Sequence, residues 1–348
     1  MDKAKNEKLG LLARFQQLWK TNPLFSTGIA LIVMVVVQTL ALTFNSSYEG
    51  FGGWFMSWLN NWISILRGNA AIGIIALGMT FVIISGGIDL SVGSVYVAVG
   101  AFTMVLLDEG PNGWLGAIGV SGIPAILIAL VAAAAFGSLL GEGNGLLISN
   151  GKMPPFIATL GTMQILRSVT QYFMKTQSPI LPDPYKEIAR FQIGGMQLMP
   201  ILYWAIAAVV MYLISKQTTF GRYVFAIGSN ERTTRLSGVN VRKVKRRVYA
   251  LTGLLVAGAA IIQTSRIGSM DYASAGSGFE MDAIAAVIVG GTSMSGGRGS
   301  VVGTVFGTLI VAVMNNLLNL IGVDPYLSTA FKGAIIIAAV LLQRKEKN

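Results

Sequence analysis

Residues 69–107 read NAAIGIIALGMTFVIISGGIDLSVGSVYVAVGAFTMVLL, and Asp89 is the single charged side chain among them. A helix needs about 20 mostly apolar residues to cross the hydrocarbon core of a bilayer. This stretch is long enough for two such helices, which we place at 69–86 and 91–107, with a glycine-containing turn around Asp89 between them. The sequence here therefore predicts two consecutive membrane-spanning helices.

Similar apolar stretches recur along the rest of the chain and bring the expected number of transmembrane helices to about ten. The other eight lie at 24–44, 122–142, 155–174, 200–215, 248–265, 281–293, 299–319 and 327–343. Residues 51–66, FGGWFMSWLNNWISIL, are rich in Trp and Phe, so we expect an interfacial segment there rather than a span. The predicted fold is an all-α polytopic membrane protein whose single transmembrane domain covers residues 24–343.

The composition agrees with a chain surrounded by membrane lipid, and it excludes several kinds of active site. Of the 348 residues, 53% are hydrophobic and 12% are charged, whereas a soluble protein carries roughly 25% charged residues. The absence of Cys and His excludes disulfides, Cys/His metal sites and histidine proton relays. The sequence has no P-loop, dinucleotide-binding or HExxH motif. We therefore expect a non-catalytic protein without cofactor or metal.

The formal net charge of +11 is distributed as a topology signal and not as a nucleic-acid-binding surface. Five Lys or Arg residues lie in the segment 1–23, nine in the loop 216–247 and three in the tail 344–348. Because the cytoplasmic loops of membrane proteins are enriched in Lys and Arg, we place all three segments in the cytoplasm. The chain then crosses the membrane an even number of times, and no nucleic-acid partner is expected.

The loop 216–247 contains the strongest local signal. Ser229 or Asn230 is suited to cap the start of a helix, and Gly238 is suited to end that helix in a left-handed conformation. The residues between them, ERTTRLS, give about two helical turns. A short capped helix on a loop is a rigid lever for a soluble partner to grip. The alternative is a solvated basic loop that only fixes the topology.

Polar residues at membrane depth are candidates for function. A buried carboxylate is costly there, and Asp89 either caps the helix that follows it and shapes a gate or contacts the substrate directly. Arg298, in a second glycine-rich turn, is a candidate partner for its charge. Asn315 and Asn319 share one helix face, where they either hydrogen-bond substrate hydroxyls or join helices.

Segments 86–100 and 290–304 resemble each other. Their paired glycines match, and the alignment places Ser91 opposite Ser295 and Gly93 opposite Gly297. An internal repeat, which is common in transporters, explains this likeness. A coincidence between two stretches rich in Gly and Ser explains it equally well.

Five further segments follow one another along the chain: SGGIDLSVGS, PPFIATLGTM, FGRYVFAIGSNERTTRLSGVNV, DAIAAVIVGGTSMSGGRGSVVGTVFG and GVDPYLSTAFKGAIIIAAV. Together, over residues 70–341, they resemble the ribose/galactoside-type permease subunits of ATP-binding-cassette (ABC) sugar importers. The resemblance implies the ABC importer permease fold in a bacterial inner membrane. It also implies three protein partners: a second permease subunit that is identical or a close paralogue, a cytoplasmic ATPase, and a periplasmic sugar-binding protein.

The same resemblance implies that the region 220–240 carries a helix that couples the permease to the ATPase. The residues to which this role is carried over are Gly228, Asn230, Glu231, Arg235, Ser237 and Gly238. Thr233 and Thr234 stand where the family usually has alanines. The contact surface expected here therefore differs in detail from that of the family.

The expected function is the translocation of a ribose- or galactose-like monosaccharide across the bacterial inner membrane. Small hydroxyl and amide side chains suit an uncharged sugar that is held weakly along a path. The residues expected to line this path or its gate are Asp89, Ser91, Ser94, Thr159, Thr162 and Asn315. The alternative is an ion-coupled secondary transporter of a small polar solute, which needs ionisable residues within its spans.

Overall fold

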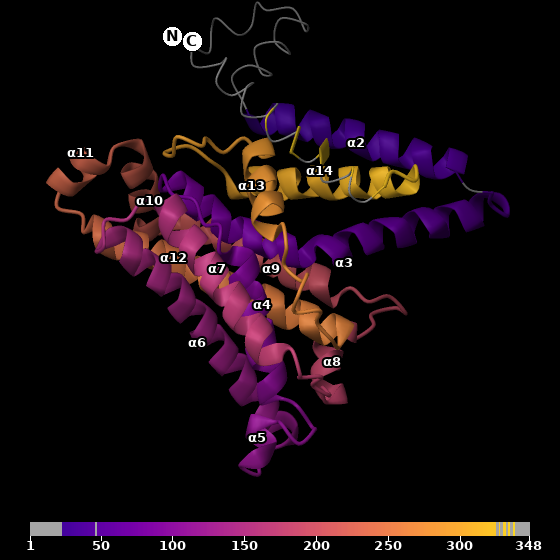
Figure 1. Ribbon diagram of the computed structural model, residues 1–348. Coiled ribbons are helices and arrows are strands. Elements are labelled where there is room, and N and C mark those ends of the chain that lie inside the picture. Colours follow the sequence, from indigo (N-terminus) through magenta and orange to yellow (C-terminus); the bar gives the residue numbers. More distant parts are fainter. Residues whose placement is uncertain are drawn as a thin grey trace, which may run out of the picture.

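A computed structural model of the chain describes residues 23–45 and 47–324 and isolated positions between 327 and 337. Within these residues every regular element is a helix (Figure 1). The helices are α2 (Pro23–Asn45), α3 (Gly50–Ile84), α4 (Val92–Leu106), α5 (Trp114–Ala117), α6 (Gly122–Ser149), α7 (Pro155–Met174), α8 (Asp183–Arg190), α9 (Met199–Gln217), α10 (Thr219–Ser229), α11 (Glu231–Leu236), α12 (Val241–Ile267), α13 (Phe279–Val289) and α14 (Val301–Leu320).

This architecture confirms the predicted all-α polytopic membrane protein. Six of the described helices, α2, α3, α6, α9, α12 and α14, are long and apolar enough to cross a membrane, and α4 is a shorter apolar helix. Each predicted span from 24–44 to 299–319 falls on a helix. Most of the last one, 327–343, lies outside the described residues.

The expectation of a separate interfacial segment at 51–66 is wrong. These residues form the first half of α3, a single helix of 35 residues. Their indole N–H groups donate to threonines of α2: Trp54 to Thr43 at 2.9 Å and Trp58 to Thr39 at 3.1 Å. Trp54 and Trp58 therefore belong to a helix–helix contact, and the helix continues through Gly68 and Asn69 without a break.

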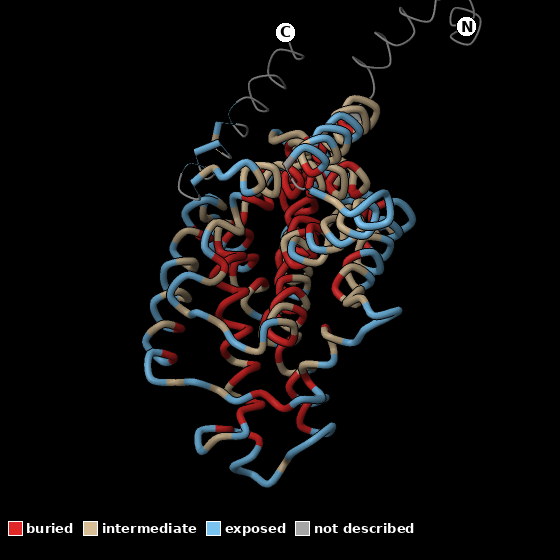
Figure 2. Tube along the Cα trace, turned by 90° about the vertical axis from the view of Figure 1, so that its right-hand side faces the viewer, coloured by how far each residue is buried: buried red, intermediate tan, exposed pale blue. Residues whose placement is uncertain are grey.

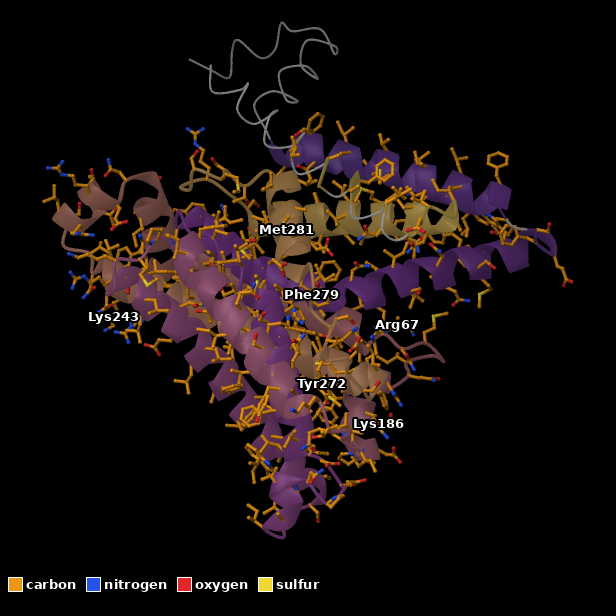
Figure 3. The ribbon with its side chains drawn as sticks, in the orientation of Figure 1. Arg67, Lys186, Lys243, Tyr272, Phe279 and Met281 are labelled. Atoms are coloured by element: carbon orange, nitrogen blue, oxygen red, sulfur yellow. The ribbon has the colours of Figure 1, made fainter. Side chains whose placement is uncertain are left out.

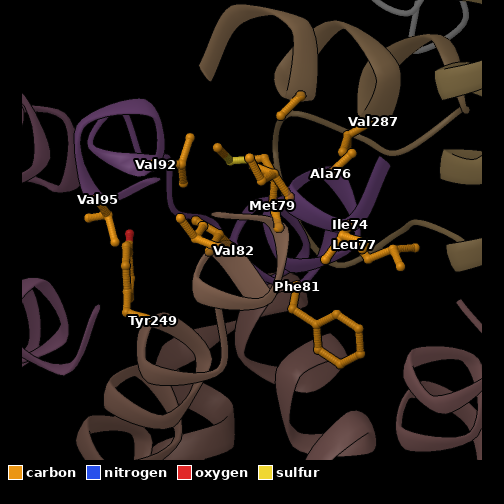
Figure 4. Close-up of a cluster of buried hydrophobic side chains, with 14 of the residues drawn as sticks. Ile74, Ala76, Leu77, Met79, Phe81, Val82, Val92, Val95, Tyr249 and Val287 are labelled. Atoms are coloured by element: carbon orange, nitrogen blue, oxygen red, sulfur yellow. The ribbon is translucent and has the colours of Figure 1, made fainter. Parts of the chain in front are cut away.

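The second half of α3 forms the centre of the bundle. Its side chains are almost continuously buried from residue 70 to residue 84. Leu77 and Val82 belong to one buried cluster with Val95 of α4, Tyr249 of α12 and Val287 of α13 (Figure 4). The residues that follow α3 are thus attached to a deeply buried helix end.

The outer helices expose apolar side chains. Val33 on α2, Leu127 on α6 and Val209 on α9 are each more than half exposed, and Figure 2 shows buried residues at the centre of the molecule with exposed ones around them. Lipid tails are as apolar as these side chains, so such a surface is stable in a bilayer.

Because lipid gives no hydrophobic drive for helix association, the helices depend on close backbone packing. A side chain added at Gly141 of α6 would overlap the backbone carbonyl of Tyr249 on α12. Gly137 and Gly253 approach each other in the same way. The order of these contacts shows that α6 and α12 are antiparallel along a seam of glycines.

The turns that end α3 and α13 have the same geometry. Gly86 and Gly291 have φ values of 80° and 84°, and in each turn the next residue donates its N–H to the carbonyl five positions back. The alignment of Ser91 with Ser295 is wrong, however. Ser91 directly precedes α4, whereas Ser295 lies inside the longer connection from α13 to α14. The likeness between the two segments is therefore confined to the turn.

Candidate functional site

The loop predicted to carry a capped helix folds into two short helices, α10 and α11, which project from the end of the molecule away from α5 and α8 (Figure 1). The side chain of Asn230 caps α11, because its Oδ1 accepts the N–H of Thr233 at 2.9 Å. Gly238 follows the helix with a φ of 83°, a conformation that favours glycine. The predicted cap, helix and stop are confirmed.

The carboxylate of Glu231 ties α11 to α12. It accepts hydrogen bonds from Arg235 of α11 at 2.6 Å and from Lys245 of α12 at 2.7 Å. These contacts hold the pKa of Glu231 below its ordinary value, and the hydrogen bond from Lys245 is the largest cause. α11 is therefore fixed to the bundle at its base as well as through the chain.

The free surface of α11 includes one large apolar side chain. Leu236 is 82% exposed, and the side chain of Arg235 is 63% exposed. Thr234, by contrast, is buried and donates to the carbonyl of Asn230 at 2.8 Å, while Ser237 bonds to the helix's own backbone. Leu236 was not predicted, although it is the one large apolar residue in ERTTRL.

The end of α10 touches two other parts of the chain at Gly228. A side chain at this position would overlap the carbonyl oxygen of Ile84, at the end of α3, and the backbone nitrogen of Gly297. Gly297 itself donates its N–H to the Ile84 carbonyl at 2.9 Å. α10 thus rests directly on both glycine-rich turns, and α11 follows it in the chain.

A buried polar cluster surrounds the connection from α3 to α4. The Oδ1 of Asp89 accepts the N–H and the hydroxyl of Ser91 at 2.9 and 2.6 Å. Asn144 of α6 donates to the Ser91 hydroxyl at 2.7 Å, and the N–H of Leu90 donates to Thr159 of α7 at 3.1 Å. Asp89 thus fixes the turn that precedes α4 through Ser91, although no side chain caps the first turn of α4 itself.

The cluster brings together three of the six predicted path or gate residues, Asp89, Ser91 and Thr159. Asn144, and Tyr249, whose hydroxyl donates to the carbonyl of Ile88 at 3.2 Å, complete it and were not predicted. An amide inside the apolar stretch of α6 was the available signal for Asn144. The connection is therefore held by side chains from α6, α7 and α12.

The remaining candidates lie elsewhere. Ser94 is one turn further along α4 and is fully buried, and Thr162 bonds to its own helix at the carbonyl of Ala158. Asn315 lies on α14, which packs against α2, α3 and α13. The expected pairing of Asp89 with Arg298 is wrong, since Arg298 is exposed and forms no ion pair with Asp89.

α7 has an exposed face that is partly polar. Gly161, Gln164 and Ser168 are exposed along one face of the helix. Exposed Ile157, Ile165 and Tyr172 lie between them on the same face, whereas Val169 and Phe173 are exposed on an apolar side. Although α7 has 20 residues, it is not among the six helices apolar enough to cross a membrane by composition. Burying polar groups in lipid is costly, so Gln164 and Ser168 are poorly suited to a lipid contact.

The sequence of the chain is similar to that of a known protein family. Residues 61–340 match the protein family described as the permease component of branched-chain amino acid transport systems. The chain belongs to this permease family. The match begins inside α3, so α2 lies outside it.

Several relatives cover most of the permease. The ribose import permease protein of Escherichia coli is 38% identical over 326 residues, which is 92% of this chain and 93% of the relative. That of Bacillus subtilis is 42% identical over 82% of this chain and 85% of its own. The galactose/methyl galactoside import permease protein of Haemophilus influenzae is 37% identical over 82% of this chain and 86% of its own. No solved structure matches the permease.

Membership of this family makes the permease a multi-pass transport component. Its two groups of candidate residues are spatially connected. α10, which leads into α11, rests on the end of α3, and the polar cluster begins with the residues that directly follow α3.

Proposed function

We propose that the permease is the membrane-spanning subunit of an ABC importer that carries a monosaccharide of the ribose or galactose type. The observation that carries this proposal is the capped and exposed helix α11, which directly follows α10, and α10 is seated through Gly228 on the end of α3. Relatives at 37–42% identity that are named for ribose and galactose import support the sugar as substrate.

The proposed orientation places α10 and α11 in the cytoplasm. The loop 216–247 that contains them carries nine Lys or Arg residues, and such enrichment is typical of cytoplasmic loops. Both chain termini then lie in the cytoplasm of a bacterial inner membrane. α5 and α8, at the other end of the bundle (Figure 1), face the periplasm, where a sugar-binding protein would dock.

In this mechanism a cytoplasmic ATPase grips α11. Leu236 and Arg235 offer exposed contacts, and Asn230, Gly238 and Glu231 keep the helix rigid through its caps and its link to α12. A displacement of α11 by ATP-driven closure of the ATPase would reach the end of α3 through the backbone contact at Gly228.

The proposed gate is the connection from α3 to α4. Asp89, Ser91 and Thr159 are fully enclosed, so they hold the connection in place and leave no room for a sugar to touch them in this state. Moving the end of α3 would strain their hydrogen bonds with one another and with Asn144. In this proposal Asp89 serves the gate and not substrate binding.

The proposed path for the sugar runs along α7 and is completed by a second permease subunit. Gly161, Gln164 and Ser168 lie on one exposed face of α7 and suit weak hydrogen bonds to hydroxyl groups. Thr162 lies on the side of Val169 and not on this face. Ser94 lies deeper, and Asn315 belongs to contacts of α14. Weak binding is sufficient because transport needs different affinities in two conformations.

The test is sugar uptake by vesicles that contain the permease, its ATPase and an added sugar-binding protein. Uptake of radiolabelled ribose or galactose is expected only with ATP inside the compartment that holds α11 and only with the binding protein present. Uptake that follows an ion gradient without ATP would instead establish the secondary-transporter alternative.

A further inference from the structure

The permease has a cavity of about 410 Å³ between the end of α6 and the start of α12. Four of the residues that line it are cationic: Arg242, Lys243, Arg246 and Arg247. The others are Glu142, Asn150 and Asn240. Figure 3 places Lys243 at the same end of the molecule as α10 and α11.

The positive charge of this cavity is only partly neutralised. Glu142 pairs with Arg246, and Arg242, Lys243 and Arg247 form no ion pair within the described residues. The Nε of Arg246 is a buried donor that also has no partner in that part of the chain. Asn240 caps α12, so the positive end of a helix of 27 residues adds to the field. A phosphate group matches such a set of donors.

Apolar surface continues from the cavity on both helices. On α6, Leu139 and Leu146 share a helix face with Glu142 and are 65% and 39% exposed. On α12, Leu254 lies on the same face as Arg247 and two turns further, which is about 10 Å along the helix. Leu254 also lines a second cavity, of about 480 Å³, whose walls are almost entirely apolar. A small free anion would leave this surface unused.

We propose that the cavity binds the headgroup phosphate of an anionic phospholipid whose acyl chains lie against the exposed leucines of α6 and α12. Basic groups next to apolar helix surface suit such a lipid by both charge and hydrophobicity. A loop that only fixes topology explains the charges but not the apolar surface that continues from them. The inference depends on the membrane location of the permease and not on its sugar or its ATPase.

The experiment is native mass spectrometry of the full-length permease in detergent, titrated with phosphatidylglycerol and with phosphatidylcholine that has the same acyl chains. We expect phosphatidylglycerol to bind more tightly. Each cation near an anionic lipid contributes about fivefold in affinity, so the pair Arg242→Gln and Arg247→Gln should weaken phosphatidylglycerol binding about 25-fold. The matched control pair, Lys216→Gln and Arg222→Gln, removes two exposed charges from the same loop outside the cavity and should leave the affinity unchanged.

Two further probes separate a lipid site from a simple anion site. Glycerol phosphate carries the headgroup charge alone, and a short-chain phosphatidylglycerol carries little acyl chain; both should bind at least tenfold more weakly than the long-chain lipid. The proposal would be overturned if glycerol phosphate bound as tightly as the long-chain lipid. It would also be overturned if the control pair lost as much affinity for phosphatidylglycerol as the cavity pair. Thermal unfolding without lipid checks that the variants are folded. If the pair Arg242→Gln and Arg247→Gln is not folded, Arg247→Gln alone is tested in its place, with an expected fivefold loss of affinity.

Discussion

Gly228 is the residue at which α10, which leads into the exposed helix α11, contacts the rest of the bundle. Its missing side chain lets the backbone of α10 lie against the carbonyl of Ile84 and the nitrogen of Gly297. Both neighbours are backbone atoms, so neither can rotate away from an added methyl group. A small change here therefore acts on the α3 connection and on the second glycine-rich turn at once.

The variant Gly228→Ala should lower the stability of the permease by about 1–3 kcal/mol, since it forces an extra group into a closed contact. Thermal unfolding in detergent measures this. The control is Gly143→Ala on α6, where an added side chain meets nothing within 4 Å and stability should be kept. An equal fall in both variants would show that Gly228 is an ordinary helix position.

Asn230 is expected to stabilise α11 by capping the start of this helix. Asn230→Ala should lower the local stability of residues 231–237 by about 1 kcal/mol, seen as faster amide hydrogen exchange in that segment. Asn230→Ser keeps an oxygen that accepts the same N–H and should exchange as the wild type does. Equally fast exchange in the two variants would argue against the cap.

The link from Glu231 to Lys245 should depend on pH in a defined direction. Because the folded-state pKa of Glu231 is lowered, the link stabilises the protein above the unfolded-state pKa and is lost as the pH falls through the folded value. The difference in unfolding temperature between the wild type and Glu231→Gln should therefore be constant at neutral pH and shrink below about pH 4.3. A difference that persists in acid would contradict this.

The residues of α11 could be predicted because caps and stops are local: Asn230, the helix and Gly238 lie within nine positions. The surroundings of Asp89 could not. Asn144 is 53 residues from its partner Ser91, and Thr159 is 69 residues from Leu90. Nothing in the sequence near Asp89 indicates which helices will lie against it.

At the scale of the helix, the apolar pattern of α3 predicts where a membrane span lies, but it does not predict that the same helix extends through the aromatic residues before it. The stretch 69–86 was expected, and the aromatic residues before it suggested a membrane interface. The indole N–H groups of Trp54 and Trp58 instead bond to α2. Whether an aromatic residue meets lipid headgroups or a neighbouring helix depends on which helices pair, and the pattern of one segment does not contain that information.

The amphipathic face of α7 allows a direct test of the proposed path. The chain contains no cysteine, so each introduced cysteine is a unique target. A charged, membrane-impermeant thiol reagent should label Gln164→Cys and Ser168→Cys in vesicles, whereas Val169→Cys on the apolar side of α7 should stay unlabelled. Sugar supplied with the binding protein and ATP should slow labelling at the first two positions. Absence of labelling at both would place this face against lipid or protein and away from the path.

At the scale of the whole molecule, the permease connects the exposed helix α11 at one end to the buried polar cluster around Asp89. α10, which directly precedes α11, rests on the end of α3, and the residues that follow α3 are pinned by α6, α7 and α12. α3 is also the centre of the buried core. In our account the bundle has no catalytic machinery of its own and moves only when a partner displaces α11.

The affinity of the ATPase subunit for the permease tests this account most directly. Leu236→Asp places a charge on the exposed tip of α11 and should weaken binding about 30-fold, the effect of losing a contact worth about 2 kcal/mol. The control Ile118→Asp alters an exposed residue beside α5 at the other end of the bundle and should leave the affinity unchanged. Undiminished binding of the ATPase to the Leu236→Asp variant would contradict the account.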